Sequence, residues 1–507
     1  MTPMHDFAGP CRDDPRARPE WGNPSADAVH SRTIAASRPS PPNPDLTTVS
    51  QSRREVHVPT DPIAFIHDLR YEDLPPSVVE QACRCLLDLA GVAAAGSTTA
   101  MSRIACDHAV EYLASPTRPA RLLFDGRAAG PVGAAFAGAA TIDSFDAHDG
   151  HALTKGHAGV AVLPALLAFA DSGPTPDGRE FLTALVLGYE IATRAGINLH
   201  ATAVDYHTSG AWNALGAAAT GARLLGLNPA QTREALGIAE FHGPRSQMMR
   251  CIDDPTMVKD GSAVGAAAGV SAALLASASF TGAPAVTMID DQEHPLWGDL
   301  GDCWRINEQY FKPFPVCRWA HPAVQVALDL RDLHSQNRTT MADIDHLEIT
   351  TFHAATRLAT RHPKTTEQAQ YSLTFAVATA FVHGTITAAH LETPQQAHPD
   401  VTRLSATMKL QESTIYEQQF PAQRHAHGEL ILRDGHRLHV GPTTARGGPD
   451  QPLTNDELTT KYHTLTDGIL SPECTTALQE TVHSLSTGSN TQILLDNILK
   501  SPIPGPA

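Results

Sequence analysis

The sequence predicts a mainly α fold, in which a large all-helical domain is joined to a smaller α+β lid domain. Residues 210–229 and 261–282 form two apolar stretches that are rich in Gly and Ala and read as helices. Residues 346–355 and 425–440 instead alternate apolar and polar side chains, and an Asp434-Gly435 turn lies within the second. Helices early in the chain and strands only later therefore indicate two domains of different composition rather than alternating βα units.

The first 58 residues are predicted to be a disordered extension. They are rich in Pro, Ser, Arg and Asp and contain almost no aromatic residues, so they bury too little apolar surface to offset the entropy of ordering. The helical pattern starts beyond Asp61. A Pro75-Pro76 pair marks the start of one helix, with Ser77 as its expected N-cap. The apolar residues of this helix recur at i, i+4, i+7 and i+11: Val78, Ala82, Cys85 and Leu89.

The change in sequence pattern after Tyr310 sets the predicted domain boundaries. We expect residues 59–309 to form the first part of the helical domain and residues 310–440 to form the α+β lid. Residues 441–507 are expected to return as helices to the helical domain. Small side chains in the Gly/Ala-rich helices let helix axes approach closely, which offsets the low helix propensity of glycine.

Composition excludes several classes of partner. The formal net charge is −17, which argues against nucleic acid or an anionic membrane as the main partner, because either needs a basic surface. The eight cysteines contain no CxxC pair and no zinc-finger spacing, which is typical of a reduced cytoplasmic protein. No secretory signal and no apolar run of membrane-spanning length is present, so we expect a cytoplasmic protein.

The sequence after residue 145 concentrates chemically active side chains just before an apolar run. These side chains are Asp146, His148, Asp149, His151, Lys155 and His157. One interpretation is a metal site in which His148 and His151 combine with an aspartate. A second is a solvated polar loop. The third is an acid–base site, in which a neutral histidine exchanges a proton and an aspartate fixes its tautomer.

Three further segments carry candidate anion-binding groups. His207 directly precedes a Gly/Ala-rich helix whose N-terminal amides can hold a carboxylate. Lys259 enters the second such helix beside glycines, where a ligand can approach the backbone. Lys312, Arg318 and His321 lie within ten residues of one another, among prolines and aromatic residues. Several cations gathered in an acidic protein indicate a small polyanionic substrate.

Together these segments resemble the MmgE/PrpD family, which includes 2-methylcitrate dehydratase, cis-aconitate decarboxylase and iminodisuccinate epimerase. The resemblance runs from about residue 60 to about residue 490. The segments that carry it are LLDLAGVAAAG, KGHAGVAVLPALLA, YHTSGAWNALGAAATGARLLGL, VKDGSAVGAAAGVSAALLASASFTGA, KPFPVCRWAHPAV and ARGGPDQPLTNDELTTKY. It implies an active site between a helical body and a lid, a homodimer, and no metal or organic cofactor.

The resemblance also implies roles for individual residues. The family's active-site acid corresponds to Asp143 or Asp146, and its lysines in the body and lid correspond to Lys259 and Lys312. Its histidines correspond to His157, His207 and His321. We therefore expect the following catalytic residues: Asp146, His157, His207 and Lys259. The expected substrate-binding residues are Lys312, Arg318, His321, His151 and Lys155.

The leading functional hypothesis is a cofactor-independent lyase acting on a small di- or tricarboxylate, similar to 2-methylcitrate dehydratase. Such an enzyme removes a proton α to a carboxylate, and water is then lost. Two departures weaken a cis-aconitate decarboxylase assignment: Ser262 stands in place of a histidine, and Phe375 stands in place of a lid tyrosine, with Tyr371 nearby. A longer loop with the extra His148 and His151 leaves the active-site acid as Asp143 or Asp146. The alternatives are an epimerase or isomerase of an imino- or hydroxy-dicarboxylate, a carboxy-lyase similar to cis-aconitate decarboxylase, and a non-catalytic polycarboxylate-binding protein.

Overall fold

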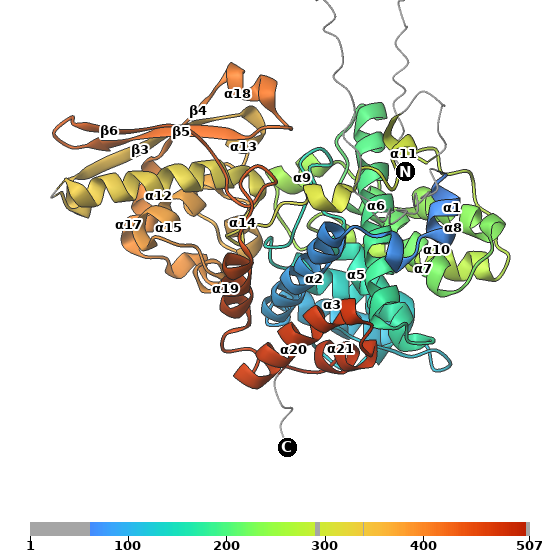
Figure 1. Cartoon of the computed structure of the whole chain (residues 1–507). Coiled ribbons are helices and arrows are strands. Elements are labelled where there is room, and N and C mark those ends of the chain that lie inside the picture. Colours follow the sequence, from blue (N-terminus) through green and yellow to red (C-terminus); the bar gives the residue numbers. More distant parts are fainter. Residues whose placement is uncertain (1–60, 289–294, 338, 503–507) are drawn as a thin grey trace, which may run out of the picture. The chain divides into compact units, whose positions relative to one another are not determined.

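The computed structural model describes residues 61–288, 295–337 and 339–502 of the chain (Figure 1). The predicted extension, residues 1–58, lies outside the described residues. Helices dominate, and the one sheet of more than two strands lies in the later part of the described chain. The mainly α fold with a smaller α+β domain is therefore confirmed.

The helical body comes first along the chain. Its elements before the lid are α1 (Pro62–Asp68), α2 (Pro76–Gly96), α3 (Ala100–Tyr112), β1 (Ala120–Arg121), β2 (Ala128–Ala129), α4 (Pro131–Asp143), α5 (Gly159–Ser172), α6 (Gly178–Thr202), α7 (Gly210–Leu224), α8 (Pro229–His242), α9 (Met248–Asp253), α10 (Ser262–Ser277) and α11 (Pro295–Gly298). Three C-terminal helices complete it: α19 (Asn455–Thr466), α20 (Pro472–Ser484) and α21 (Thr491–Ile498). Buried residues of these last helices, among them Tyr462 and Leu494, share one apolar core with α2, α5 and α6.

The lid combines helices with a four-stranded sheet of order β4-β3-β5-β6. Its elements are α12 (His321–Gln336), β3 (Ile344–Thr351), α13 (His353–Thr356), α14 (Thr366–Gln370), α15 (Leu373–His383), α16 (Ala388–Glu392), α17 (Pro399–Thr407), β4 (Lys409–Glu412), α18 (Thr414–Gln419), β5 (His425–Leu432) and β6 (Arg437–Thr444). Strands β5 and β6 pair antiparallel, and Gly435 in their turn has a φ of 89°, which glycine adopts without steric cost. The predicted hairpin is confirmed.

Helices α7 and α10 approach each other closely, which explains why glycine occupies the positions where they touch. A Cβ atom on Gly265 would lie 2.8 Å from the Cα of Gly210, and one on Gly269 would lie 2.4 Å from the carbonyl oxygen of Ala214. Both distances are well inside van der Waals contact, so a larger side chain at either position would push the helices apart. This contact brings the N-terminal ends of α7 and α10 together, which positions the site described below.

Two local findings complete the fold. Helix α2 begins at Pro76 with Pro75 at the N-cap, so the predicted cap at Ser77 is wrong. Proline suits the first turn of a helix because the backbone N–H that it lacks would have no partner there. Within the described residues, every helix is too short or too polar to cross a lipid bilayer.

Candidate active site

A buried cluster of charged and polar side chains forms where several element ends meet. Helix α4 ends at Asp143, the loop that follows leads to α5, and the turn before α10 and the segment before α12 come from elsewhere in the chain. We name the group the Asp-His-Lys cluster. Its members, all buried, are Asp143, Asp146, His148, His157, Lys259, Asp260, Lys312 and Gln370.

The strongest contact in the cluster joins Asp146 to Lys312. The Lys312 Nζ lies 2.5 Å from Asp146 Oδ1, and both side chains are at most 3% exposed. Burial opposes ionisation of Asp146, but the ammonium groups of Lys312 and Lys259 outweigh it and hold the pKa of this carboxyl well below its usual range. Burial likewise opposes the charge on Lys312, yet the Asp146 carboxylate raises its pKa. Asp146 is therefore a fixed carboxylate and Lys312 a fixed cation.

His157 is held in one tautomer. Its Nδ1 lies 2.6 Å from the backbone carbonyl oxygen of Asp149, and because a carbonyl can only accept, Nδ1 carries the hydrogen. The other nitrogen, Nε2, lies 3.6 Å from Asp260 Oδ2 and 3.9 Å from Asp146 Oδ1. Burial and the Lys312 charge hold the pKa of His157 well below its usual value. At neutral pH His157 is therefore uncharged, and its Nε2 presents an unprotonated lone pair.

A second histidine lies beside the first. The rings of His148 and His157 are 4.2 Å apart at nearly a right angle, and His148 Nε2 lies 3.3 Å from Asp143 Oδ1. Burial and Lys312 lower the pKa of His148, whereas burial raises that of Asp143 to about 6. The cluster thus contains two pairs of a histidine and a carboxyl group: His148 with Asp143, and His157 with Asp260.

Lys259 connects the body to the lid. Its Nζ donates to Gln370 Oε1 over 2.7 Å, and the same oxygen accepts from the backbone N–H of Asp146 over 2.9 Å. The Tyr371 ring lies 4.8 Å from the ammonium group. Lys259 has a φ of 47°, a left-handed conformation that costs a non-glycine residue about 1–2 kcal/mol. Such strain is retained where the position of a side chain matters.

The turn before α10 is joined to the histidine loop through Ser209. The Ser209 hydroxyl donates to Asp260 Oδ2 over 2.8 Å and accepts from the backbone N–H of His157 over 3.1 Å. Asn213, one turn further along α7, donates to the carbonyl oxygen of His157 over 3.1 Å. The N-terminal end of α7 therefore holds His157 through both its backbone N–H and its backbone carbonyl, and holds Asp260 beside it.

Two family models of known proteins match this chain. The MmgE/PrpD N-terminal domain matches residues 63–292, and the MmgE/PrpD C-terminal domain matches residues 314–487. The chain belongs to the MmgE/PrpD family. The first model covers the body up to α10 and the second covers the lid with α19 and α20, so the Asp-His-Lys cluster takes residues from both.

Curated relatives match over most of their length. A cis-aconitate decarboxylase-like protein, oryM, of Aspergillus oryzae is 23% identical over 489 residues, which is 88% of this chain and 98% of the relative. The cis-aconitate decarboxylase of Homo sapiens is 24% identical over 87% of this chain and 94% of its own length. That of Aspergillus terreus is 22% identical over 87% and 95%. These relatives support an enzyme of this family without fixing its reaction.

The structure brings four of the residues expected from the MmgE/PrpD pattern into the cluster: Asp146, His157, Lys259 and Lys312. The other expected residues have different neighbours. His207 is half-buried, its backbone pairs with that of Gln247, and only the following residues, Thr208 and Ser209, turn inwards. Its catalytic role stays a prediction.

The two other loop residues pack outside the cluster. His151 is buried and its Nε2 lies 2.7 Å from Glu308 Oε2. Lys155 is half-buried with its ammonium group 4.1 Å from the centre of the Tyr206 ring. Both lie in the turn between Gly150 and His157, so they hold the shape of the histidine loop. Direct binding of substrate by either residue stays a prediction.

Arg318 and His321 are engaged in backbone contacts. The guanidinium of Arg318 donates to the carbonyl oxygens of Arg446 and Ala445, 2.7 and 3.1 Å away. The Nε2 of His321 lies 3.1 Å from the carbonyl oxygen of Val316, which lies in the segment that carries Lys312. These contacts support the segment around Lys312, and substrate binding by either side chain stays a prediction.

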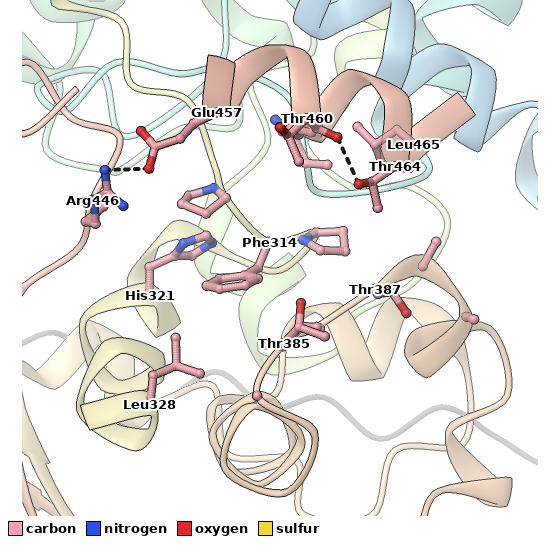
Figure 2. Close-up of a pocket in the computed structure, with 18 of the residues that line it drawn as sticks. Phe314, His321, Leu328, Thr385, Thr387, Arg446, Glu457, Thr460, Thr464 and Leu465 are labelled. Atoms are coloured by element: carbon pink, nitrogen blue, oxygen red, sulfur yellow. Dashed lines mark hydrogen bonds and ion pairs between the residues drawn. The ribbon is translucent and has the colours of Figure 1, made fainter. Parts of the chain in front are cut away.

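A cavity of about 1100 Å³ adjoins the cluster. Figure 2 shows His321 and Phe314 beside it, with Thr460 and Thr464 of α19 on the opposite side. Ala147 and Pro313, which directly follow Asp146 and Lys312 in the chain, also line it. The cavity therefore reaches the backbone next to the Asp146–Lys312 pair.

The histidine loop depends on a close approach at Gly150. A Cβ atom there would lie 2.6 Å from His157 Nδ1 and 2.6 Å from the Tyr310 hydroxyl oxygen. We expect Gly150→Ala to displace His157, to lower the free energy of unfolding by about 1–3 kcal/mol and to reduce turnover at least about tenfold. Thermal unfolding and an activity assay measure both. Gly441→Ala is the matched control, since a Cβ atom there meets open space; equal behaviour of the two variants would contradict the role of Gly150.

Metal removal gives a further prediction. Among the described residues, Asp146, His148 and His157 offer ligand atoms within 4.8 Å of one another. The ammonium group of Lys312 already lies on Asp146 Oδ1, and a divalent cation placed there would meet that positive charge at short range. We expect turnover to be unchanged after treatment with a strong chelator and dialysis. Loss of turnover that added zinc restores would instead support the metal interpretation.

Proposed function

We propose that this protein is a cofactor-independent lyase that acts on a small di- or tricarboxylate. The observation that carries the proposal is the meeting of two lysines with a histidine of fixed tautomer inside one buried cluster. Lys259 and Lys312 supply positive charge, and His157 Nε2 supplies a base. A buried site of this kind suits reactions in which negative charge builds up on a carboxylate.

Lys259 is the better placed lysine for binding a substrate carboxylate. Its hydrogen-bond acceptor is the neutral amide oxygen of Gln370, whereas Lys312 is neutralised by Asp146. A carboxylate exchanged for the amide oxygen gains a charge-assisted hydrogen bond, which is roughly twice as strong as a neutral one. As the substrate gains charge next to its carboxylate, both ammonium groups stabilise it most effectively with water excluded.

The relatives favour decarboxylation as the outcome, although the two sequence departures noted above weaken a cis-aconitate decarboxylase assignment. In decarboxylation of a β,γ-unsaturated acid, the C–C bond to the carboxylate breaks and its electron pair forms a new double bond. The former double bond shifts, and its far carbon takes a proton from the enzyme. Tyr371 lies beside Lys259, so a lid tyrosine is present in the site even though Phe375 replaces the expected one. Dehydration and epimerisation use the same cations and base, and therefore remain the alternative outcomes.

A substrate panel tests the proposal. The chelator-treated protein is incubated with cis-aconitate, citrate, 2-methylcitrate, iminodisuccinate and tartrate, and the products are identified by proton NMR and by trapping CO₂. We expect conversion of one acid with release of CO₂. Formation of water and an alkene without CO₂ would identify a hydro-lyase, and inversion at one carbon an epimerase.

Replacing Lys259 by Met isolates its contribution. The variant keeps the length of the side chain but removes the charge, so kcat/KM should fall about 10²–10³-fold. The unfolding temperature should fall less than in Lys312→Met, because Asp146 keeps Lys312 as its direct partner. Lys409→Met, at an exposed lysine of β4, serves as the control. Equal turnover of both variants would contradict the binding role of Lys259.

A further inference from the structure

Asp260 is a buried carboxyl group to which neither the sequence pattern nor the proposed roles above give a function. It lies in the turn before α10 and is 2% exposed. Its Oδ2 accepts from the Ser209 hydroxyl and lies 3.6 Å from His157 Nε2. Its Oδ1 has no hydrogen-bond partner among the described residues. Oδ2 is therefore the oxygen that faces the histidine and from which a proton can be passed to it, whereas Oδ1 leaves the carboxyl group without a second partner.

Decarboxylation requires a proton that His157 alone cannot supply. Each turnover replaces a C–CO₂⁻ bond by a C–H bond, so it consumes one proton inside a site shielded from water. The Nδ1 proton of His157 is held by the Asp149 carbonyl. Burial and Lys312 hold the pKa of His157 well below its usual value, so at neutral pH its Nε2 carries no proton. A neighbouring group must supply one.

The other buried carboxyl groups in and beside the cluster do not face His157 in a protonated form. Asp146 is ionised by its pair with Lys312. Asp143 faces His148, and the side chain of Asp149 accepts from the Tyr189 hydroxyl over 2.6 Å. Burial, reinforced by the charges of Asp143 and Asp146, raises the pKa of Asp260 to about 7. The folded protein therefore favours the protonated form of Asp260, which lies next to the histidine.

The groups around Asp260 set the pH at which it ionises. Asp260 interacts electrostatically with groups from several elements: Asp143 and Asp146 from the end of α4 and its loop, His157 from the same loop, Lys312 and Cys317 from the segment before α12, Cys251 from α9, and Tyr206 and Tyr371. Two carboxyl groups raise the proton affinity of Asp260, whereas Lys312 and the Ser209 hydroxyl lower it.

Building on the proposed function, we infer that Asp260 is the proton reservoir of the site and acts through His157. The O–H bond of the Asp260 carboxylic acid breaks as an N–H bond forms at His157 Nε2. The imidazolium then gives that proton to the substrate carbon while CO₂ leaves, and returns to its neutral form. The Asp260 carboxylate regains a proton from water once product has left. Atoms and charges balance over one turnover, with one proton taken from solvent.

A titration without substrate tests this inference independently of the reaction. NMR of ¹⁵N-histidine-labelled protein follows the Nε2 of His157, assigned by its loss in His157→Gln. We expect a pH-dependent shift near neutral pH in the wild type that is absent in Asp260→Asn. Asp143→Asn is the comparison variant: it should alter the signal of His148 and move the step of His157 to lower pH, because one carboxyl group that raises the pKa of Asp260 is gone, but it should not abolish that step. An identical His157 titration in the wild type and Asp260→Asn would overturn the inference.

Two further measurements keep the test decisive. If Asp260→Asn fails to fold, Ser209→Ala removes a hydroxyl that lowers the pKa of Asp260, so the step of His157 should move to higher pH; an unmoved step would overturn the inference. If an acid is converted, Asp260→Asn should lower kcat about 100-fold with little change in KM, and unchanged kcat would overturn it. If no acid is converted, the proposed function fails. The titration still shows whether Asp260 and His157 share a proton.

The raised pKa of Asp260 also gives a stability signature. The folded state favours the protonated carboxyl, whereas the unfolded chain ionises at the ordinary value, so Asp260 costs stability increasingly as pH rises from about 4 to about 8. Asp260→Asn removes this cost. Its unfolding temperature relative to the wild type should therefore rise over that range, and a constant difference would contradict a protonated Asp260 in the folded protein.

Discussion

Replacing Lys312 by Met should abolish measurable turnover and lower the free energy of unfolding by about 3–5 kcal/mol. The loss of stability follows because Asp146 would remain as a buried carboxylate without its partner at 2.5 Å. The loss of turnover follows because a cation that stabilises charge on the substrate has been removed, which typically costs about 10²–10³-fold in rate. Chemical denaturation and the activity assay measure the two effects separately.

A double variant separates the two roles of Lys312. Asp146→Asn combined with Lys312→Met removes both charges, so no buried ion is left unpaired, and most of the lost stability should return. Turnover should stay absent, because the cation is still missing. Recovery of turnover in the double variant would show that Lys312 acts only by neutralising Asp146, and would contradict its role towards the substrate.

Replacing His157 by Gln should reduce kcat about 10³-fold with little change in stability. Glutamine can still donate to the Asp149 carbonyl that now accepts from Nδ1, so the loop keeps its hydrogen bond. It has no group that accepts and passes on a proton, so the acid–base step is lost. The measurement is kcat and KM on the converted acid, together with the unfolding temperature.

His334 provides the control for His157. It is another buried histidine, in α12 of the lid beside Phe381, and lies outside the Asp-His-Lys cluster. His334→Gln should affect the unfolding temperature more than kcat. If both substitutions reduced kcat equally, the loss at His157 would reflect general loosening of the fold, and the assignment of the base would be wrong.

Much of the fold was predictable because long, periodic segments dominate it. The Gly/Ala-rich stretches became α7 and α10, and the close contacts of Gly265 and Gly269 explain their composition. Short elements were not predictable. Helix α9 has six residues and packs into the core of the lid, and β4 has four residues that are largely exposed. Neither is long enough to show a period.

Site residues could be predicted where they lie in a recognisable sequence motif. Lys259, Lys312, Asp146 and His157 lie in segments of recognisable pattern, and they meet in the cluster. Gln370 was not predicted, because a single glutamine has no pattern and its contact with Lys259 spans 111 positions of the chain.

Asp260 directly follows Lys259 in the sequence, so a place near the site could be expected for it. Its proposed role could not be predicted, because only the folded chain shows that its carboxyl group lies next to His157 and Ser209. Arg318 is a second such case. Its guanidinium donates to the backbone carbonyl oxygens of Arg446 and Ala445, contacts that no sequence pattern could reveal, and substrate binding by Arg318 stays a prediction.

The most direct test of the central claim is proton NMR of the chelator-treated protein in D₂O with the panel of small carboxylic acids. The account predicts that one acid is converted and that its product carries deuterium at one carbon next to a carboxylate, because the enzyme delivers a solvent-derived proton there. His157→Gln should lose this incorporation. Binding of an acid with neither conversion nor exchange of any carbon-bound hydrogen would contradict the account and indicate a protein that only binds polycarboxylates.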